Sequence, residues 1–307
     1  MKSTILDKTK LVNSVFSKVY KKYDLMNDIM SLGIHRIWKN RFIDWMNPLQ
    51  NSKLIDVASG SGDIAKLFSA KTKNLSKITC VEPNNEMFEE GKNNLKDLSN
   101  INWVKSNAES LPVEDDVYDF YTISYGIRNV TDINKTLKEA YRVLKPGGRF
   151  MCLEFSKINN EIINLFYKNY SRLIPVLGKY VVGSSEPYDY LIKSINDFYS
   201  QDELIELIKN RGFSNVEYRN LSNGICAIIA PASRTDNPGI NAAKRISCLA
   251  SKTLIFTRVF SFTGKVHKYC LMSDQFMNLD AGRFLNSVTS KKKRSDGYCL
   301  ISLIGPV

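Results

Sequence analysis

From about residue 53 to residue 156, the chain alternates between short apolar runs and longer stretches whose apolar residues recur every three or four positions. The short runs end in turn residues and predict strands, whereas the longer stretches predict amphipathic helices. The expected elements are strands at 53–58, 77–82, 101–105, 117–124 and 148–154, and helices at 62–70, 84–97 and 131–144. Because such alternation implies parallel pairing with helices on both faces, we expect an α/β fold with a doubly wound, mostly parallel, Rossmann-like sheet.

The same pattern resumes later in the chain. A helix at 201–211 ends at Gly212, and two further strand-like runs, 215–219 and 224–230, are separated by the turn at 222–224. An Asn-Gly turn between two such runs predicts a hairpin. This hairpin would close the edge of the sheet and bring it to seven strands.

Two segments, at 11–47 and 157–196, stand outside this alternation and are rich in apolar residues. The large side chains at the end of the first segment are Trp38, Phe42, Trp45 and Met46. We expect the two segments to be helical lids over a pocket for a lipophilic ligand, with peripheral contact to a membrane surface left open. The alternative is ordinary core packing, which is the commoner role of any single methionine or aromatic residue.

The first predicted strand ends in the turn Gly60-Ser61-Gly62, and the second ends in Glu82. A glycine turn that opens a helix lets a ligand approach the backbone, and an acid after the second strand can accept both ribose hydroxyls of an adenosine. The turn also matches the G-x-G-x-x-A pattern of dinucleotide folds, so a nicotinamide cofactor is one candidate. Asp56 favours S-adenosylmethionine instead, because an acid in this strand can orient the turn and, through water, the cationic methionine end.

Charge is spread unevenly along the 307 residues, whose net charge is +12. Residues 1–230 hold 31 Lys and Arg against 27 Asp and Glu, whereas residues 231–307 hold 12 against 4. The second part has a linker-like start and a basic cluster at 291–294, which could contact acidic lipids or nucleic acid but is more often simply solvated. We therefore expect one domain at 1–230, a poorly ordered basic extension at 231–307, and no nucleic-acid partner.

Cysteine and histidine usage bears on metal binding and on the compartment. None of the six cysteines forms a C-x-x-C pair, and the histidines are His35 and His267, so no metal site is expected. Cys80, Cys152 and Cys226 lie in strand-like runs and are expected to be buried free thiols. The polar start of the chain and the lack of a long uncharged apolar stretch predict a cytoplasmic protein, with association with the inner face of the membrane left open.

Three longer motifs carry a family resemblance. YDLMNDIMSLGIHRIW at 23–38 and RVLKPGGRFMCLEFS at 142–156 resemble the two signature blocks of the UbiE-type quinone-biosynthesis C-methyltransferases. TISYGIRNVT at 122–131 is similar to the active-site strand of the same family. With the glycine turn, the resemblance runs from about residue 12 to residue 230, and its motifs occur in the right order.

The resemblance implies a class I fold that uses S-adenosylmethionine to methylate a ring carbon of a lipophilic, polyprenylated quinol. The substrate would be 2-polyprenyl-6-methoxy-1,4-benzoquinol, demethylmenaquinol or both, and a homodimer or a quinone-biosynthesis complex stays open. Matched by position, the cofactor contacts would be Ser61, Glu82, Asn107, Ala108 and Ser124. Ser61 stands where the family more often has threonine, an exchange that keeps the hydroxyl.

The chemistry of such a reaction points to further residues. Methylation of an aromatic carbon needs electron density, which a quinol supplies when an adjacent hydroxyl loses its proton; a free phenol has a pKa of about 10, so the site must favour the phenolate. Arg128, at the carboxyl end of a strand, is the candidate cation for this task, and the alternative is an ion pair with Asp132. Asn129 could orient the quinol oxygen, and Tyr23 could hydrogen-bond the opposite hydroxyl or simply pack.

Two polar residues have weaker claims. His35 is more typical of a packed side chain than of a base, and Glu154 is either a polar pocket group or a structural anchor.

Three classes of function remain. A quinol C-methyltransferase is favoured by Arg128 and Asn129 beside two lipophilic segments. A nicotinamide-dependent oxidoreductase would need a hydride acid–base pair that we do not find, and a non-catalytic cofactor-binding protein would dock on membrane or RNA.

Overall fold

The computed structural model describes residues 31–158 and 185–234 continuously, single positions within 10–28 and 160–175, and the short strands at 257–260 and 266–269. Tyr23, expected to act in catalysis, lies outside the described residues, as do most side chains of the expected lids before residue 31 and between residues 159 and 184. The chain divides into two compact units, Met1–Pro238 and Gly239–Val307.

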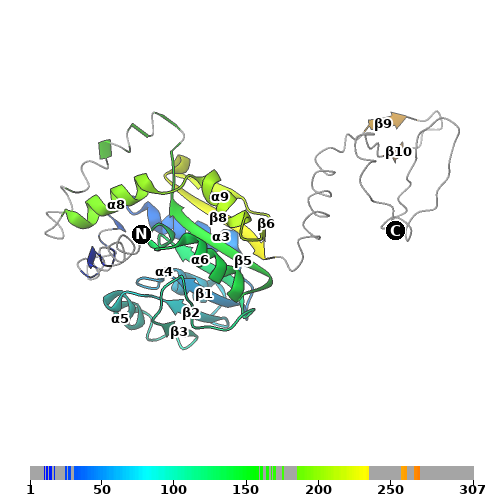
Figure 1. Cartoon of the computed structure of the whole chain (residues 1–307). Coiled ribbons are helices and arrows are strands. Elements are labelled where there is room, and N and C mark those ends of the chain that lie inside the picture. Colours follow the sequence, from blue (N-terminus) through cyan, green and yellow to red (C-terminus); the bar gives the residue numbers. More distant parts are fainter. Residues whose placement is uncertain are drawn as a thin grey trace. The chain divides into compact units, whose positions relative to one another are not determined.

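The first unit is built on one large sheet. Its strands are β1 (Lys53–Val57), β2 (Lys77–Val81), β3 (Ile101–Val104), β4 (Tyr118–Ser124), β5 (Leu144–Phe155), β6 (Phe213–Ser214), β7 (Tyr218–Leu221) and β8 (Cys226–Arg234). They lie in the order β3-β2-β1-β4-β5-β8-β6, and β7 also pairs with β8 (Figure 1). The strands from β3 to β5 pair in parallel, whereas β8 runs antiparallel to β5, β6 and β7. The expected doubly wound, mostly parallel sheet is therefore confirmed, with β6 and β7 sharing the seventh position.

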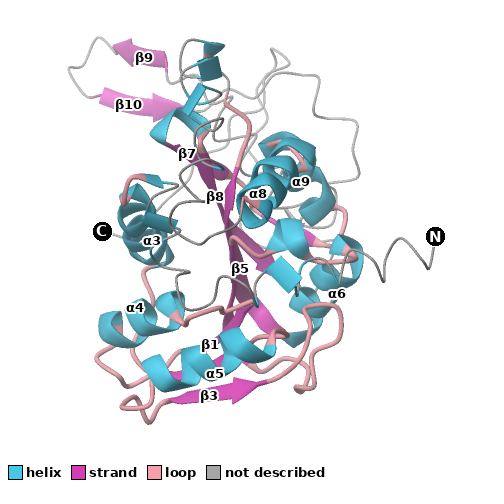
Figure 2. Ribbon diagram, turned by 90° about the vertical axis from the view of Figure 1, so that its left-hand side faces the viewer, coloured by secondary structure: helices cyan, strands magenta, loops and turns pink. Residues whose placement is uncertain are grey.

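Helices cover both faces of this sheet (Figure 2). They are α3 (Ile34–Met46), α4 (Asp63–Lys71), α5 (Asn85–Asn94), α6 (Ile133–Val143), α8 (Glu186–Asp197) and α9 (Gln201–Lys209), with the short 3-10 turns η2 (Ile127–Asn129) and η3 (Ser222–Gly224). On one face α6 and α9 pack against the sheet, for example through Leu137 and Tyr121. On the other face α3 and α4 pack against the sheet. There, the rings of Phe68 and Phe120 pack edge to face, with their centroids 5.7 Å apart.

The strand β1 is buried on both faces but contains one charged residue, Asp56. Successive strand residues point to opposite faces, so Leu54 enters one hydrophobic cluster and Ile55 the other. All residues from Leu54 to Val57 are buried, and Asp56 is the only charged one among them. A carboxyl group in such a position is costly and points to a role other than packing.

Side chains at the helix starts explain where two helices begin. Ser200 forms a capping box with Glu203 at α9. Asp132 caps α6, accepting hydrogen bonds from the backbone N–H groups of Asn134 at 3.0 Å and Lys135 at 3.1 Å. Asp132 is thus engaged as a helix cap.

The helix α3 corrects one expectation. Trp38, Phe42 and Met46 are buried in the same cluster as α4 and the sheet, and α3 contacts β5 and β8. The indole Nε1 of Trp38 donates a hydrogen bond to Ser222 Oγ at 3.1 Å. The prediction that this stretch belongs to a lid is therefore wrong for 34–46, which is a core helix; its outer side keeps Ile37 exposed.

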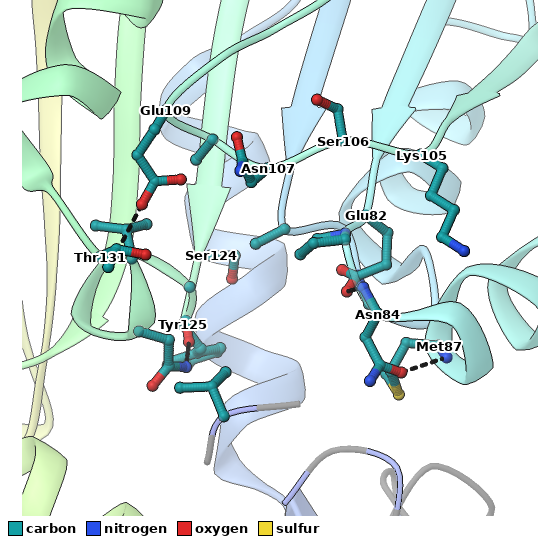
Figure 3. Close-up of a pocket in the computed structure, with 18 residues that line it drawn as sticks. Glu82, Asn84, Met87, Lys105, Ser106, Asn107, Glu109, Ser124, Tyr125 and Thr131 are labelled. Carbon is teal, nitrogen blue, oxygen red and sulfur yellow. Dashed lines mark hydrogen bonds between the residues drawn. The ribbon is translucent and has the colours of Figure 1, made fainter. Parts of the chain in front are cut away.

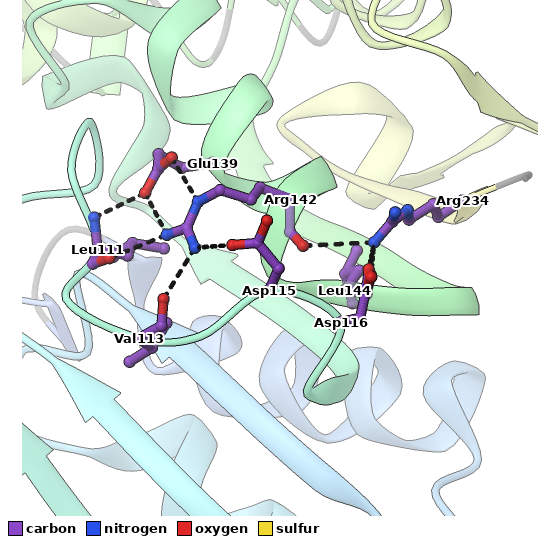
Figure 4. A network of polar contacts seen from close by, with 8 residues as sticks. All are labelled: Leu111, Val113, Asp115, Asp116, Glu139, Arg142, Leu144 and Arg234. Atoms are coloured by element: carbon purple, nitrogen blue, oxygen red, sulfur yellow. Dashed lines mark hydrogen bonds and ion pairs between the residues drawn. The ribbon is translucent and has the colours of Figure 1, made fainter.

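The hairpin of β7 and β8 is confirmed, but β8 continues past residue 230 to Arg234. Arg234 pairs with Asp116 and donates to the carbonyl oxygen of Leu144 (Figure 4). Next to it, Arg142 donates to Glu139 Oε2 at 2.7 Å and to Asp115 Oδ1 at 2.5 Å. These contacts fasten the last strand and the turn before β4 to the carboxyl end of α6.

In the second unit, the structure describes the strands β9 (Thr257–Phe260) and β10 (Val266–Tyr269), which pair antiparallel. The basic cluster at 291–294 lies outside the described residues. In the first unit, Cys80, Cys152 and Cys226 are buried free thiols, as expected. Within the part of the chain that the structure describes, no helix is long and apolar enough to cross a membrane.

Candidate active site

A cavity of about 420 Å³ lies at the carboxyl ends of β1 to β4, where ligands bind in open α/β sheets (Figure 3). Six of the expected site residues line it: Gly60, Glu82, Asn107, Ala108, Ser124 and Asn129. Four others do not reach the wall of the cavity: Asp56, Ser61, Gly62 and Arg128. The strand ends therefore bring together most of the residues chosen from the sequence.

Glu82 joins the glycine turn to the turn after β2. Its Oε2 accepts a hydrogen bond from the backbone N–H of Gly60 at 2.9 Å, and its Oε1 accepts one from the backbone N–H of Asn84 at 3.0 Å. Burial raises the pKa of Glu82 to about 7, and the two backbone hydrogen bonds oppose this rise. Because each carboxylate oxygen has a second lone pair, Glu82 can still accept hydrogen bonds from a ligand in the cavity.

The two glycines of the turn have different tasks. Both adopt positive φ, +56° at Gly60 and +88° at Gly62, which favours glycine. Gly60 lines the cavity, whereas a Cβ on Gly62 would lie 2.5 Å from Cδ1 of Leu95. Gly62 is therefore required by packing and backbone conformation, and Ser61 between them is buried in the turn.

Asp56 lies beneath the turn. Its Oδ1 accepts a hydrogen bond from Thr122 Oγ1 at 2.6 Å, whereas its buried Oδ2 has no hydrogen-bond partner among the described residues. Burial raises the pKa of Asp56 to about 7, and the charge of Glu82 adds to this rise. The hydroxyl of Ser124, in the cavity wall, is likewise buried without a partner in the described part of the chain. Two unsatisfied oxygens at this depth suit a polar ligand or water.

Arg128 follows the strand β4 and forms a buried ion pair. Its Nη1 lies 2.5 Å from Glu154 Oε1 on β5, and it also donates to the carbonyl oxygen of Tyr125 at 2.7 Å. The two charged side chains are only 6% and 2% exposed. The alternative of an ion pair with Asp132 is wrong, and Glu154 is the residue that anchors the guanidinium. Burial raises the pKa of Glu154, while the charge of Arg128 opposes this.

Aromatic rings surround this ion pair. The guanidinium carbon of Arg128 lies 5.5 Å from the ring centroid of Phe155, and that ring lies 5.1 Å from Tyr125 and 6.3 Å from Trp38. Tyr125 also lines the cavity, so the cluster and the cavity share a wall. Tyr167 belongs to the same neighbourhood: burial raises its pKa to about 12, and the charge of Arg128 lowers it. An aromatic cluster around a buried Arg128–Glu154 ion pair thus adjoins the cavity.

Comparison with known proteins identifies the family. The model of the ubiE/COQ5 methyltransferase family matches residues 3–232. The chain belongs to this family. A Rickettsia bellii protein named ubiquinone/menaquinone biosynthesis C-methyltransferase UbiE is 52% identical over 230 residues, which cover 72% of this chain and 92% of that protein. A Rickettsia prowazekii protein of the same name is 52% identical over 226 residues, covering 71% of this chain and 90% of that protein.

Solved structures agree on the fold of the methyltransferase. A SAM-dependent methyltransferase of Thermotoga maritima, described as a possible histamine N-methyltransferase, matches with a TM-score of 0.50 and 20% identity, covering 71% of this chain and 98% of that one. A chain in the complex of a Haloferax volcanii methyltransferase with the Trm112 methyltransferase activator matches with a TM-score of 0.54 and 15% identity, covering 71% and 97%. The protein is an S-adenosylmethionine-dependent methyltransferase, and the nicotinamide alternative is set aside.

One residue that shapes the methyltransferase site, Glu109, was not among those expected from the sequence. Its side chain lines the cavity and accepts a hydrogen bond from the backbone N–H of Thr131 at 2.6 Å (Figure 3) and another from the backbone N–H of Asp132 at 3.2 Å. It ties the turn after β3 to the turn before α6, and both turns line the cavity. The sequence could have pointed to Glu109, because it directly follows Asn107 and Ala108, the two expected cofactor contacts of that turn.

His35 is not a candidate base for the methyltransferase. Its side chain is buried, and its Nδ1 lies 2.7 Å from the hydroxyl of Ser31. Burial, together with the positive charge of Lys39, lowers the pKa of His35 to about 4. It is therefore neutral at physiological pH and packed, as expected. No group of three or more His, Cys, Asp or Glu in the described ranges is placed to hold a metal ion.

Proposed function

We propose that this methyltransferase methylates a ring carbon of a polyprenylated quinol, 2-polyprenyl-6-methoxy-1,4-benzoquinol or demethylmenaquinol. The Rickettsia relatives, which match nearly along their whole length, are named for ubiquinone and menaquinone biosynthesis. The observation that carries the proposal is the shared wall of the cavity and the aromatic cluster. There, Asn129 and Tyr125 face the cavity while Arg128 lies among rings beside it.

The cavity residues fit S-adenosylmethionine, which supplies an electrophilic methyl group when bound. Glu82 would accept hydrogen bonds from the ribose hydroxyls, and Asn107 and Ala108 would line the adenine side. The unsatisfied oxygen of Ser124 would accept a hydrogen bond from the amino group of the methionine end, and that of Asp56, which lies behind the wall, would do so through water. Ser61 and Gly62, which do not line the cavity, would act by shaping the turn.

Arg128 would favour the phenolate form of the quinol. Two tyrosines lie near it: burial raises the pKa of both Tyr167 and Tyr190, the charge of Arg128 opposes this rise at both, and the charge of Glu154 adds to it at Tyr190. A quinol hydroxyl in the same space would feel the same attraction. Because Arg128 stays protonated, its role would be to stabilise negative charge and to position the water that takes the proton.

Asn129 and Tyr23 would hold the quinol oxygens. Asn129 lines the cavity and lies on the same turn, η2, as Arg128, so its amide would donate a hydrogen bond to the oxygen beside the reacting carbon. Tyr23, on the N-terminal segment, would donate to the opposite hydroxyl. Two directed donors would fix which ring carbon faces the methyl donor.

The protein must contact a membrane to reach a polyprenylated substrate, because such a substrate partitions into lipid. We assign this contact to the inner face of the membrane. The outer side of α3 suits it, since Ile34 and Ile37 are exposed, and Arg36 and Arg41 on the same helix are exposed too. Co-sedimentation with anionic vesicles, lost in Ile37→Glu, would support this contact, and unchanged sedimentation would contradict it.

A methyl-transfer assay tests the reaction. The purified protein is incubated with methyl-labelled S-adenosylmethionine and each reduced, demethylated quinone, and the products are identified by mass. Label on the ring carbon of at least one quinol is expected. Label on neither ring would remove the proposed function.

The role of Arg128 needs a variant that still folds. Arg128→Ala leaves Glu154 buried without its cation, a change that typically costs about 3–5 kcal/mol of stability. The double variant Arg128→Met with Glu154→Leu removes both charges and should stay folded. We expect it to bind S-adenosylhomocysteine like the wild type but to transfer methyl at least ~100-fold more slowly, equivalent to ~2.7 kcal/mol. Undiminished transfer would show that the cation is not needed.

A further inference from the structure

The hydroxyl of Tyr190, on α8, donates a hydrogen bond to the side-chain oxygen of Asn129 at 3.0 Å. Tyr190 is 61 positions further along the chain, in a segment that sequence reasoning treated only as a lipophilic lid. Asn129 is the expected substrate-orienting residue and lines the cavity. This contact therefore connects the second lid segment directly to the reaction site.

This contact and one with Tyr125 together set which edge of the amide faces the site. An asparagine amide presents an acceptor oxygen on one side and two N–H donors on the other. The Nδ2 of Asn129 lies 3.4 Å from the backbone carbonyl of Tyr125, which can only accept, and the Oδ1 takes the Tyr190 hydroxyl. The Tyr125 carbonyl therefore selects this orientation, the Tyr190 hydroxyl holds the amide in it, and one N–H donor is left for an oxygen in the cavity.

That orientation matters for a negatively charged substrate oxygen. A quinol that has lost its proton needs donors around the oxygen, whereas an amide turned by 180° would present its carbonyl and repel the charge. The Tyr125 contact is long, so it selects the orientation only weakly, and the shorter hydrogen bond from Tyr190 is what holds the amide in place. Burial raises the pKa of Tyr190, which keeps the hydroxyl protonated and able to donate.

The helix α8 holds Tyr190 at this place. Its residues Tyr188, Leu191 and Ile195 are buried together, and Phe155, next to Glu154 on β5, packs against them. The helix also contacts η2, which carries Asn129. Seating α8 on the end of β5 thus places the Tyr190 hydroxyl over η2.

We propose that Tyr190 is a positioning residue that fixes the Asn129 amide with its donor edge toward the substrate oxygen, so that α8 must be seated for methyl transfer. The inference rests on the proposed function, because it assigns Asn129 a substrate oxygen to hold. It adds a residue, and a helix, that act through Asn129 without touching the reacting atoms.

The test uses Tyr190→Phe, which removes only the hydroxyl, in the full-length protein. The matched control is Tyr188→Phe on the same helix, because the hydroxyl of Tyr188 is buried with no hydrogen-bond partner among the described residues. We expect Tyr190→Phe to lower kcat about tenfold, the effect of one lost hydrogen bond, while the Kd for S-adenosylhomocysteine changes less than about twofold. Tyr188→Phe should leave both constants within about twofold.

A double-mutant cycle separates positioning from general structure. Asn129→Ala removes the amide, so adding Tyr190→Phe to it should cause no further loss of kcat. Independent losses that multiply in the double variant would overturn the proposal, as would a Tyr190→Phe protein indistinguishable from Tyr188→Phe.

A readout without substrate keeps this test distinct from that of the reaction. In amide nuclear magnetic resonance spectra of the substrate-free protein, the side-chain signals of Asn129 should shift or broaden in Tyr190→Phe and stay unchanged in Tyr188→Phe. If the wild type methylates neither quinol, the proposed function fails while these spectra still decide whether Tyr190 orients Asn129. Unchanged Asn129 signals in Tyr190→Phe would refute the positioning role.

Discussion

Asp56 carries a carboxyl group into a buried strand, and its ionisation should affect the stability of the protein. Burial raises its pKa from the ordinary value of 3.8 to about 7. Between roughly pH 4 and pH 7, the folded state then binds more protons than the unfolded state, so the free energy of unfolding falls as pH rises through this window. Above about pH 7, Asp56 is ionised in both states, and its contribution to the free energy of unfolding falls no further.

We predict that Asp56→Asn removes the share of this slope that belongs to Asp56. At pH 8, without cofactor, the variant should be more stable than the wild type by on the order of 2–4 kcal/mol, because one pKa unit corresponds to about 1.4 kcal/mol. Urea unfolding at intervals from pH 4 to pH 9 measures this. The control Asp97→Asn removes an exposed carboxyl group and should follow the wild type. An Asp56→Asn protein that keeps the full slope would contradict the assignment.

At the residue scale, the sequence predicted which residues gather at the cavity better than it predicted which side chains form ion pairs. Gly60, Glu82 and Ser124 follow parallel strands, and such strand ends meet at one edge of the sheet, so their gathering around one cavity could be foreseen. The partner of Arg128 could not be found in the same way. Local spacing suggested a residue one turn away, whereas Glu154 lies 26 positions later on the neighbouring strand β5.

At the element scale, the periodic pattern predicted helices but not the surfaces that they cover. Trp38, Phe42 and Met46 recur every four residues, which indicates one apolar face of α3. A core face and a lid face have the same spacing, so the sequence could not distinguish them. Contact with β8 settles the matter, because that strand is close to α3 only in the folded sheet.

Substitutions on the two sides of α3 test its role as a core helix. Phe42 is fully buried, so we predict that Phe42→Ala lowers the free energy of unfolding by about 3–4 kcal/mol through lost burial and the cavity that remains. Ile37, on the same helix, is 58% exposed, and Ile37→Ala should change stability by less than about 0.5 kcal/mol. Urea unfolding measures both variants. Similar small losses in both would mean that Phe42 does not belong to the core.

At the scale of the whole molecule, the end of the methyltransferase domain lies further along the chain than composition suggested. A boundary at residue 230 would cut β8, whose last residues pair with β5 and β6: Ser233 lies opposite Arg149, and Arg234 lies opposite Phe213. Arg234 also reaches Asp116 and Leu144 (Figure 4). The family match ends at residue 232 and the first compact unit at Pro238.

Two truncated chains distinguish the boundaries. We predict that a chain ending at Pro238 keeps the melting temperature and the S-adenosylhomocysteine affinity of the full protein, because every strand of the large sheet is then complete. A chain ending at Ala230 loses the last four residues of β8 and the ion pair of Arg234, and its melting temperature should fall by about 10 °C or more. Thermal unfolding and calorimetry measure these quantities. If the chain ending at Pro238 is also destabilised, residues beyond it support the fold and the second unit is more than an appended extension.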